Sequence, residues 1–163
     1  MATIRDLLQD DLIIEEIAAT DKIGVLREFS RLLRSTNRIE NEESLVRILL
    51  ERESLGSTGI GDGVAIPNAK LHLLPELIVV FGRSGSGVDF QSLDEKPVYL
   101  FFLLVTPDDM PGEHLKALAR ISRILKNPLI REKLRGASYQ RQIKKIILEE
   151  DGRYPQPQDT NLK

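Results

Sequence analysis

The residues best suited to chemistry lie in one short stretch that begins at Arg52. Arg52 is followed by a loop with Ser57 and Thr58, and then by glycines at positions 59, 61 and 63. A guanidinium fork, hydroxyl groups and backbone N–H groups are the donors that a phosphoryl group requires. Alternating glycines allow positive φ or a close backbone approach, so such a loop can direct N–H groups at an anion. We therefore expect Ser57, Thr58 and Gly59 to bind phosphate beside Arg52.

The glycine motif is short, and it fits a purely structural turn as well. GIGDG does not match G-x-G-x-x-G, and no Gly-Lys-Ser/Thr follows it, so it is neither a dinucleotide fingerprint nor a P-loop. Several aspartates lie in expected loops but lack the D-x-D-x-D-G spacing of a calcium site. They are better explained as surface and turn residues: Asp62, Asp89, Asp94, Asp108 and Asp109.

Two histidines and no cysteine limit the remaining chemistry. His72 and His114 are far apart and lack H-E-x-x-H spacing, so we predict neither a metal site nor a cofactor. His114 lies where a polar loop enters an expected helix, where an imidazole either faces a cleft or merely caps and packs. Without cysteine, disulfides and thiol catalysis are excluded.

Length and composition indicate one globular domain. The chain has 163 residues, 41% hydrophobic and 29% charged, with a net charge of -2. This length is enough for a hydrophobic core that needs no disulfides or metal ions to stabilise it, and the charge balance gives no reason to expect nucleic-acid binding. The longest apolar run, residues 97–105, is about half of the roughly 20 residues that a membrane-spanning helix needs. The first residues lack the pattern of a secretory signal, so we expect a cytoplasmic protein without membrane insertion.

Hydrophobic periodicity predicts helices on both sides of two buried strands. The continuous apolar strands require that both faces of their sheet are covered, and the order of elements is not a clean alternation. We therefore predict an α/β single-domain sandwich, with a mixed β-sheet flanked by helices on both faces, over residues 1–150 and a polar, disordered tail over 151–163. The expected helices are 21–35, 41–52 with Asn41 as N-cap, 113–126, 128–134 and a last one capped by Ser138, and the expected strands are 77–81 and 98–105.

Four segments together carry a family resemblance: ERESLGSTGIGDGVAIPNAK, VVFGRSGSGVDF, PVYLFFLLVTPDD and EHLKALARISRIL. They resemble the type 2 enzyme IIA domains of the bacterial phosphoenolpyruvate-dependent phosphotransferase system, especially the fructose and nitrogen-regulatory branch. The resemblance extends from about Ile4 to Glu150. In that family the segment reads A-I-P-H, and here its last position is Asn68.

The resemblance implies roles for particular residues. The family's histidine accepts a phosphoryl group from the carrier HPr or its nitrogen-branch counterpart, and its position is Asn68. The second histidine, which helps to orient and stabilise the phosphohistidine, matches His114, and the arginine near the phosphoryl group matches Arg52. Ser57 and Thr58 fall in the accompanying loop.

Asn68 departs from the family at the residue that the transfer requires. A neutral imidazole has an exposed lone pair that can attack phosphorus, whereas resonance with the carbonyl removes the lone pair of an amide nitrogen. We therefore expect no phosphorylation of Asn68, which is either an engineered or a natural substitution. His72 lies four residues further on but matches no phosphorylated position of the family.

Two functions remain open. The first is a phosphocarrier or regulatory domain of the transferase family with its acceptor replaced. The second is a regulatory module that binds partners such as a kinase or a transporter independently of phosphorylation; an anion sensor that uses the glycine loop is a weaker third. Because no transporter segment is fused to the chain, we expect the nitrogen-regulatory type rather than a sugar-specific one.

Overall fold

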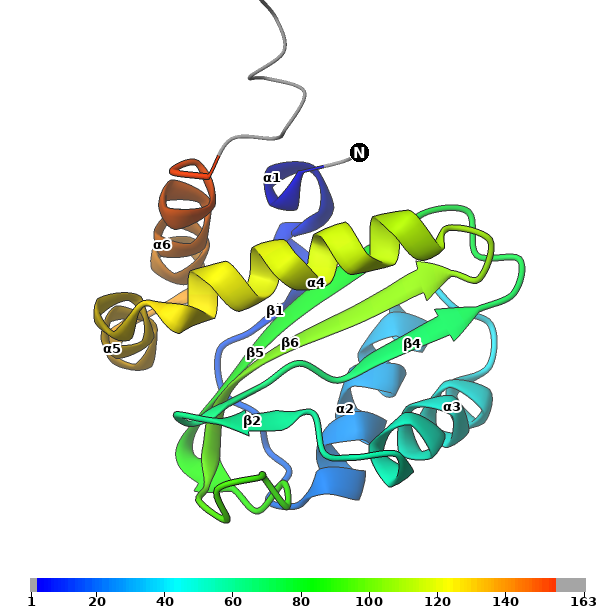
Figure 1. The fold of residues 1–163 in the computed structure, drawn as a ribbon, viewed down its shortest axis with the longest axis horizontal. Coiled ribbons are helices and arrows are strands. Elements are labelled where there is room, and N and C mark those ends of the chain that lie inside the picture. Colours follow the sequence, from blue (N-terminus) through cyan, green and yellow to red (C-terminus); the bar gives the residue numbers. More distant parts are fainter. Residues whose placement is uncertain (1–2, 155–163) are drawn as a thin grey trace, which may run out of the picture.

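The computed structural model describes residues 3–154, which form a mixed six-stranded sheet with helices on both faces (Figure 1). The centre of the sheet is an antiparallel pair, β5 (Ile78–Val88) and β6 (Val98–Pro107). Outside β5 lies β1 (Ile13–Ile14), in parallel. The other side of β6 pairs in succession with two short parallel strands, β3 (Val64–Ala65) and β4 (Asn68–Leu71), and β2 (Gly59–Gly61) lies antiparallel to β3. The predicted mixed sheet is confirmed.

The core of the molecule is built on β6. Residues 100–105 are each 1% exposed or less, because helices cover both faces of this strand. Phe102 packs edge to face on Phe81, and Phe101 packs in the same way on Phe29 and Phe90. The sequence predicted β6 well, because an uninterrupted apolar run is typical of a strand that is buried on both faces.

The strand β5 is longer than the predicted 77–81, because it continues through residues 82–88. These residues, GRSGSGV, are polar and rich in glycine, which is not the composition of a typical strand. Glycine at position 82 leaves room for neighbouring side chains, since a Cβ there would lie 2.8 Å from Ile17 Cδ1 and 3.0 Å from Cε1 of Phe29 on the helix α2 (Lys22–Ser35). The Ile17 loop and the Phe29 side chain of α2 thus pack closely against the backbone at this glycine.

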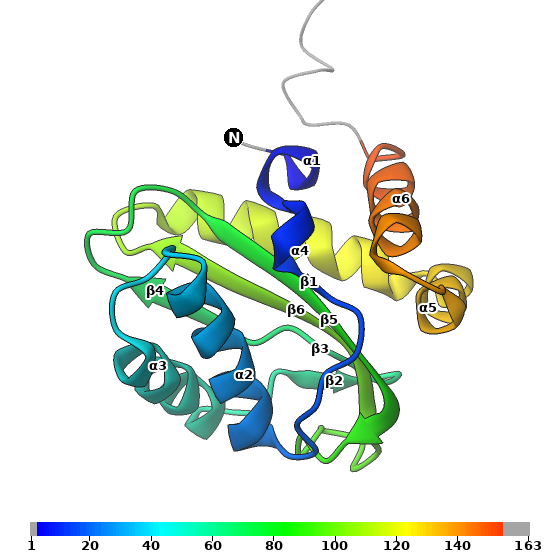
Figure 2. The same ribbon diagram turned by 180° about the vertical axis from the view of Figure 1, so that it is seen from behind.

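Two groups of helices flank the sheet. In Figure 2, α2 (Lys22–Ser35) and α3 (Glu42–Ser54) lie in front of the strands, and α4 (Pro111–Lys126) lies behind them. Helices α5 (Pro128–Gly136) and α6 (Gln140–Asp151) pack against α4. Before β1 the chain forms the short helix α1 (Ile4–Leu7) and the 3-10 turn η1 (Asp10–Leu12). Asn41 caps α3 as predicted, since its side chain accepts from the amide of Ser44. Within residues 3–154 no helix is long and apolar enough to cross a membrane.

Two predictions about the C-terminal part are wrong. The N-cap of α6 is Tyr139, not Ser138, whose amide donates instead to Gln142 Oε1 at 2.8 Å. Asp151, which was placed in the polar tail, is the last residue of α6 and is buried. It is held there by an ion pair with Arg120 on α4, with 2.9 Å between Nε and Oδ1. Residues 155–163 of the predicted tail lie outside the described residues.

Candidate functional site

The glycine motif forms a tight hairpin. Asp62 and Gly63 connect β2 to β3 with φ angles of 58° and 76°, and a two-residue turn of type I′ requires positive φ at both positions. Gly59 is buried, and a Cβ on it would lie 3.0 Å from the Cα of Ser92. Turn geometry therefore explains the glycine at position 63, and close packing explains the glycine at position 59.

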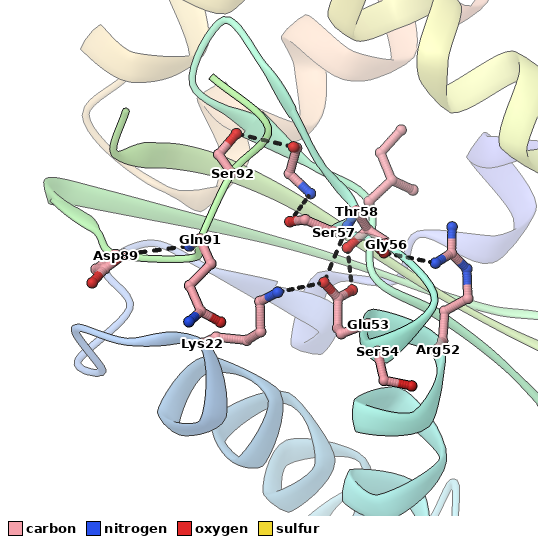
Figure 3. Close-up of polar contacts among 12 residues, drawn as sticks. Lys22, Arg52, Glu53, Ser54, Gly56, Ser57, Thr58, Asp89, Gln91 and Ser92 are labelled. Atoms are coloured by element: carbon pink, nitrogen blue, oxygen red, sulfur yellow. Dashed lines mark hydrogen bonds and ion pairs between the residues drawn. The ribbon is translucent and has the colours of Figure 1, made fainter. Parts of the chain in front are cut away.

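A buried carboxylate holds the loop before this hairpin (Figure 3). Glu53 Oε1 accepts from the Thr58 amide at 3.0 Å, and the Thr58 hydroxyl donates to Oε2. Lys22 at the start of α2 completes the group, with its Nζ 2.9 Å from Glu53 Oε1. The Gly59 amide donates to Ser57 Oγ at 3.1 Å. Thr58 and Gly59 thus donate inside the protein and could bind a phosphate only if the loop rearranged, whereas the Ser57 hydroxyl accepts from Gly59 and keeps its own proton. The role of these three residues as phosphate ligands stays a prediction.

Arg52 lies in the last turn of α3, beside this loop. Its Nη1 donates to the carbonyl of Gly56 at 2.9 Å, as Figure 3 shows. Within residues 3–154 no carboxylate lies within 4.0 Å of its guanidinium group, so its charge is not neutralised by a local ion pair. The side chain is oriented by a neutral carbonyl and retains donors for an anion.

Asn68 is the first residue of β4, which pairs with β6 on one side and packs against α3. The Asn68 side chain is half-buried, and its Nδ2 donates to the carbonyl of Ile66 at 2.9 Å. Side chains alternate along a strand, so Asn68 and Lys70 extend from the same face of β4. Lys70 is exposed and, in the described part of the chain, has no carboxylate partner. A cation therefore follows Asn68 on the same face.

His114 lies in the first turn of α4 and is 5% exposed. Its Nδ1 is 2.7 Å from the hydroxyl oxygen of Thr106, the ladder partner of Lys70 on β6. Burial lowers the pKa of the imidazole below its usual value, and the positive charges of Lys70 and Arg52 lower it further. His114 is therefore neutral near pH 7.

Of the three predicted catalytic residues, Arg52 and His114 lie close enough for the charge of Arg52, with that of Lys70, to lower the pKa of His114. Asn68 lies on β4, which pairs with β6 and packs against α3, and it shares its face of the strand with Lys70. Lys70 and Thr106 belong to the same group but were not predicted. Both had a signal in the sequence: Lys70 is two residues after Asn68 in a strand, and Thr106 is the first polar residue after a long apolar run.

His72, the other histidine of the chain, is not part of this group. His72 is exposed just after β4, with its Nδ1 3.2 Å from Asp108 Oδ2. Among residues 3–154, no cluster of three or more His, Asp and Glu side chains is placed to hold a metal ion. His72 and Asp108 form an exposed pair beyond the end of the strand.

Comparison with known proteins decides the family. The family model for "Phosphoenolpyruvate-dependent sugar phosphotransferase system, EIIA 2" matches residues 6–150. This chain belongs to that family. Membership supports a phosphocarrier or regulatory role in the phosphotransferase system, as the four sequence segments had indicated.

Among its relatives, a nitrogen regulatory protein of Bradyrhizobium diazoefficiens is 39% identical over 134 residues, covering 82% of this chain and 87% of the relative. A fructose-specific EIIA component of Haloferax volcanii is 34% identical, covering 83% and 88%. The crystal structure of the nitrogen regulatory protein IIA-Ntr from Neisseria meningitidis superposes with a TM-score of 0.82 at 31% identity, over 88% of this chain and 98% of the other. The similarity to nitrogen regulatory proteins therefore holds in both sequence and fold.

Proposed function

We propose that this chain is a regulatory member of the enzyme IIA family, most similar to the nitrogen-regulatory type, that does not accept a phosphoryl group at position 68. One observation carries the proposal. The side chain that begins β4, on the same face of the strand as Lys70, is the amide of Asn68, and the family resemblance aligns this position with the phosphohistidine.

The chemistry of Asn68 supports this proposal. Its nitrogen lone pair is delocalised into the carbonyl, and its N–H already donates to Ile66, so no nucleophile is present at that position. Arg52 and Lys70 still supply positive charge, and His114 supplies a neutral imidazole. The substitution thus removes the acceptor and leaves the groups that would stabilise the negative charge of a phosphoryl group.

The partner that we propose is an HPr-like carrier protein of the phosphotransferase system, in a cytoplasmic setting. The nitrogen regulatory relatives from several bacteria support a regulatory output, through a kinase or a transporter. The Escherichia coli mannitol IIA, which shares this fold at 19% identity, has been solved in complex with phosphorylated enzyme IIB of the mannitol system. That protein shows that the fold can bind a partner that carries a phosphoryl group.

The decisive experiment restores the acceptor. The chain and its Asn68→His variant are incubated with phosphoenolpyruvate, enzyme I and HPr or the nitrogen-branch carriers, and acid-labile phosphate is read by intact mass. We expect a gain of one phosphoryl group by Asn68→His alone. Asn68→Gln is the matched control, because it changes the side chain but keeps an amide, and it is expected to gain none.

Phosphorylation of the unmodified chain would contradict the proposal if the phosphoryl group were on Asn68, so its position has to be assigned. The exposed imidazole of His72 would then be the first residue to examine, and His72→Gln would show whether it is the acceptor. Loss of the mass gain in that variant would assign the phosphoryl group to His72.

The alternative function is a binding module that acts without any phosphorylation. The observation in its favour is the hydrogen bond from Asn68 Nδ2 to the carbonyl of Ile66, two residues earlier, which would give the side chain a structural role in place of a chemical one. It predicts that neither the chain nor Asn68→His gains a phosphoryl group, while partner binding measured by calorimetry is the same for both.

A further inference from the structure

We propose that Thr106 is a positioning residue that fixes His114 in the tautomer with its proton on Nε2. The role of this tautomer in phosphoryl transfer rests on the proposed function, whereas the tautomer itself does not. The observation behind the proposal is the 2.7 Å hydrogen bond between Thr106 Oγ1 and His114 Nδ1, with both residues buried.

The direction of this hydrogen bond follows from the surroundings of Thr106. The residue is completely buried, and Nδ1 of His114 is the only hydrogen-bond partner of its hydroxyl among the described residues. If the ring donated to the hydroxyl, the hydroxyl proton would be buried without an acceptor, which is unfavourable. If the hydroxyl donates to the ring, both groups are satisfied. Thr106 is therefore the donor, and Nδ1 is the acceptor.

An accepting Nδ1 requires a neutral ring, because both nitrogens of an imidazolium are donors. The environment of His114 favours this form, since the ring is 5% exposed and Lys70 and Arg52 place positive charge nearby. In a neutral ring that accepts at Nδ1, the single N–H is on Nε2. This nitrogen has no hydrogen-bond partner among the described residues.

A donor in this place has a specific use. An anionic oxygen held by Arg52 and Lys70 can accept a hydrogen bond from Nε2, and the ring does not need to lose or gain a proton. With the opposite tautomer, Nε2 would present a lone pair to the same oxygen and would repel it. Thr106 thus determines whether His114 stabilises or repels an oxyanion.

The backbone holds both partners in place. Thr106 lies in the ladder between β6 and β4, opposite Lys70, and the His114 amide donates to the carbonyl of Met110 at 3.1 Å in the first turn of α4. The donor lies on the sheet and the ring on the helix that follows it. We therefore expect the hydrogen bond to persist in solution.

The first test is a long-range ¹H–¹⁵N NMR spectrum of the full chain near pH 7, which distinguishes the two tautomers directly. Because the chain has two histidines, His72→Gln assigns the signals of His114. We expect the Nε2–H tautomer in the unmodified chain and in Thr106→Ser, which keeps the hydroxyl. Thr106→Val, which has the same shape without a donor, is expected to shift the population toward Nδ1–H.

An unmodified chain with the Nδ1–H tautomer would overturn the proposal, even if Thr106→Val failed to fold. So would an unchanged Nε2–H population in a folded Thr106→Val variant. Either result would mean that Thr106 does not determine the position of the proton.

The second test measures the consequence for transfer in the Asn68→His background. We expect Thr106→Val to slow phosphorylation by about tenfold, the loss typical of a partner that orients a functional histidine, and Thr106→Ser to restore the rate. An equal rate in all three proteins would overturn the positioning role. If Asn68→His itself gains no phosphoryl group, the proposed function fails, and the NMR result still decides the tautomer.

Discussion

His114 is a buried imidazole whose near neighbours are one hydroxyl and two cations. An imidazole in such a place is neutral over a wider pH range than an exposed one, because both desolvation and positive charge disfavour the imidazolium. In the site that we propose, a neutral ring would donate a hydrogen bond to an anion held by Arg52 and Lys70 without changing its own charge.

Removal of either cation is expected to raise the pKa of His114. In Lys70→Met and in Arg52→Met, one source of positive potential is lost, and burial together with the remaining cation continues to lower the pKa of His114. The measurement is an NMR pH titration of the ring protons. Lys116→Met is the matched control, because Lys116 lies on the same helix, pairs with Glu113 at 3.6 Å and is not a cause of the lowered pKa. A titration midpoint that is the same in all variants would contradict the prediction.

The lowered pKa also gives stability a definite dependence on pH. At pH values between the ordinary histidine pKa of about 6.5 and the lower pKa of His114 in the folded chain, the unfolded chain binds a proton that the folded chain does not. The free energy of unfolding is therefore fully retained above about pH 6.5 and decreases as the pH falls through this window.

Urea unfolding at pH 7 and pH 5 tests this dependence. We expect the unmodified chain to lose more stability on acidification than His114→Asn, in which the titrating group is absent. Carboxylates with lowered pKa values, such as Asp10 and Glu43, take up protons only below their ordinary range near pH 4, so they do not contribute to the difference between pH 7 and pH 5. Equal losses in both proteins would show that His114 is not responsible.

At the scale of elements, the loop between α3 and β2 is held by a buried ion pair. Glu53 is 7% exposed and Lys22 is 9% exposed, and Glu53 also accepts both donors of Thr58 (Figure 3). Lys22 in addition lies 4.9 Å from the centre of the Phe90 ring. The carboxylate thus connects the first turn of α2, the last turn of α3 and the loop beside Arg52.

Breaking this pair from one side is expected to be costly. Glu53→Gln leaves the Lys22 ammonium buried without its counter-charge, and the free energy of unfolding should fall by about 3 kcal/mol or more. The double variant Lys22→Met with Glu53→Gln should lose less than Glu53→Gln alone, because it leaves no buried charge. Urea denaturation followed by circular dichroism measures both.

An exposed ion pair provides the control. Glu43 pairs with Arg27 on the surface of α2 and α3, with 71% of the Glu43 side chain exposed. We expect Glu43→Gln to change stability little, because solvent screens such pairs. If Glu53→Gln were equally harmless, the buried network would not hold the loop.

At the scale of the whole molecule, Arg83 connects distant parts of the chain. It extends from β5, is 9% exposed and donates to three carbonyls, those of Glu15, Leu134 and Ala137. Within residues 3–154 no carboxylate lies within 4.0 Å of it. Two of its acceptors lie at the C-terminal end of α5, where the helix dipole favours a positive charge.

Arg83→Met is expected to lower the free energy of unfolding by about 3 kcal/mol, because charge-assisted bonds are lost and buried carbonyls are left unpaired. Arg83→Lys should retain part of this stability, since it keeps the charge but not the fork of donors. Thermal and urea unfolding compare them with Arg31→Met, a change at an arginine whose side chain is 67% exposed. A loss no larger than that of Arg31→Met would contradict the prediction.

The sequence by itself determined the helices α2, α3 and α4, the strand β6, the first part of β5 and the family. These features depend on local information: the period of the apolar residues, the Asn41 cap and motifs read in order along the chain. It also determined that the residue at position 68 is an amide, which is the basis of our proposal that this chain does not accept a phosphoryl group there.

Only the tertiary structure decided how the site is assembled. The role of Thr106 depends on a contact between a strand and a helix, that of Glu53 on a lysine from another helix, and that of Arg83 on the end of α5. Such partners lie many residues apart in the sequence, and no local sequence pattern predicts which of them come into contact. Burial, which removes competing water and gives these contacts their strength, exists only when the sheet and its helices have packed together.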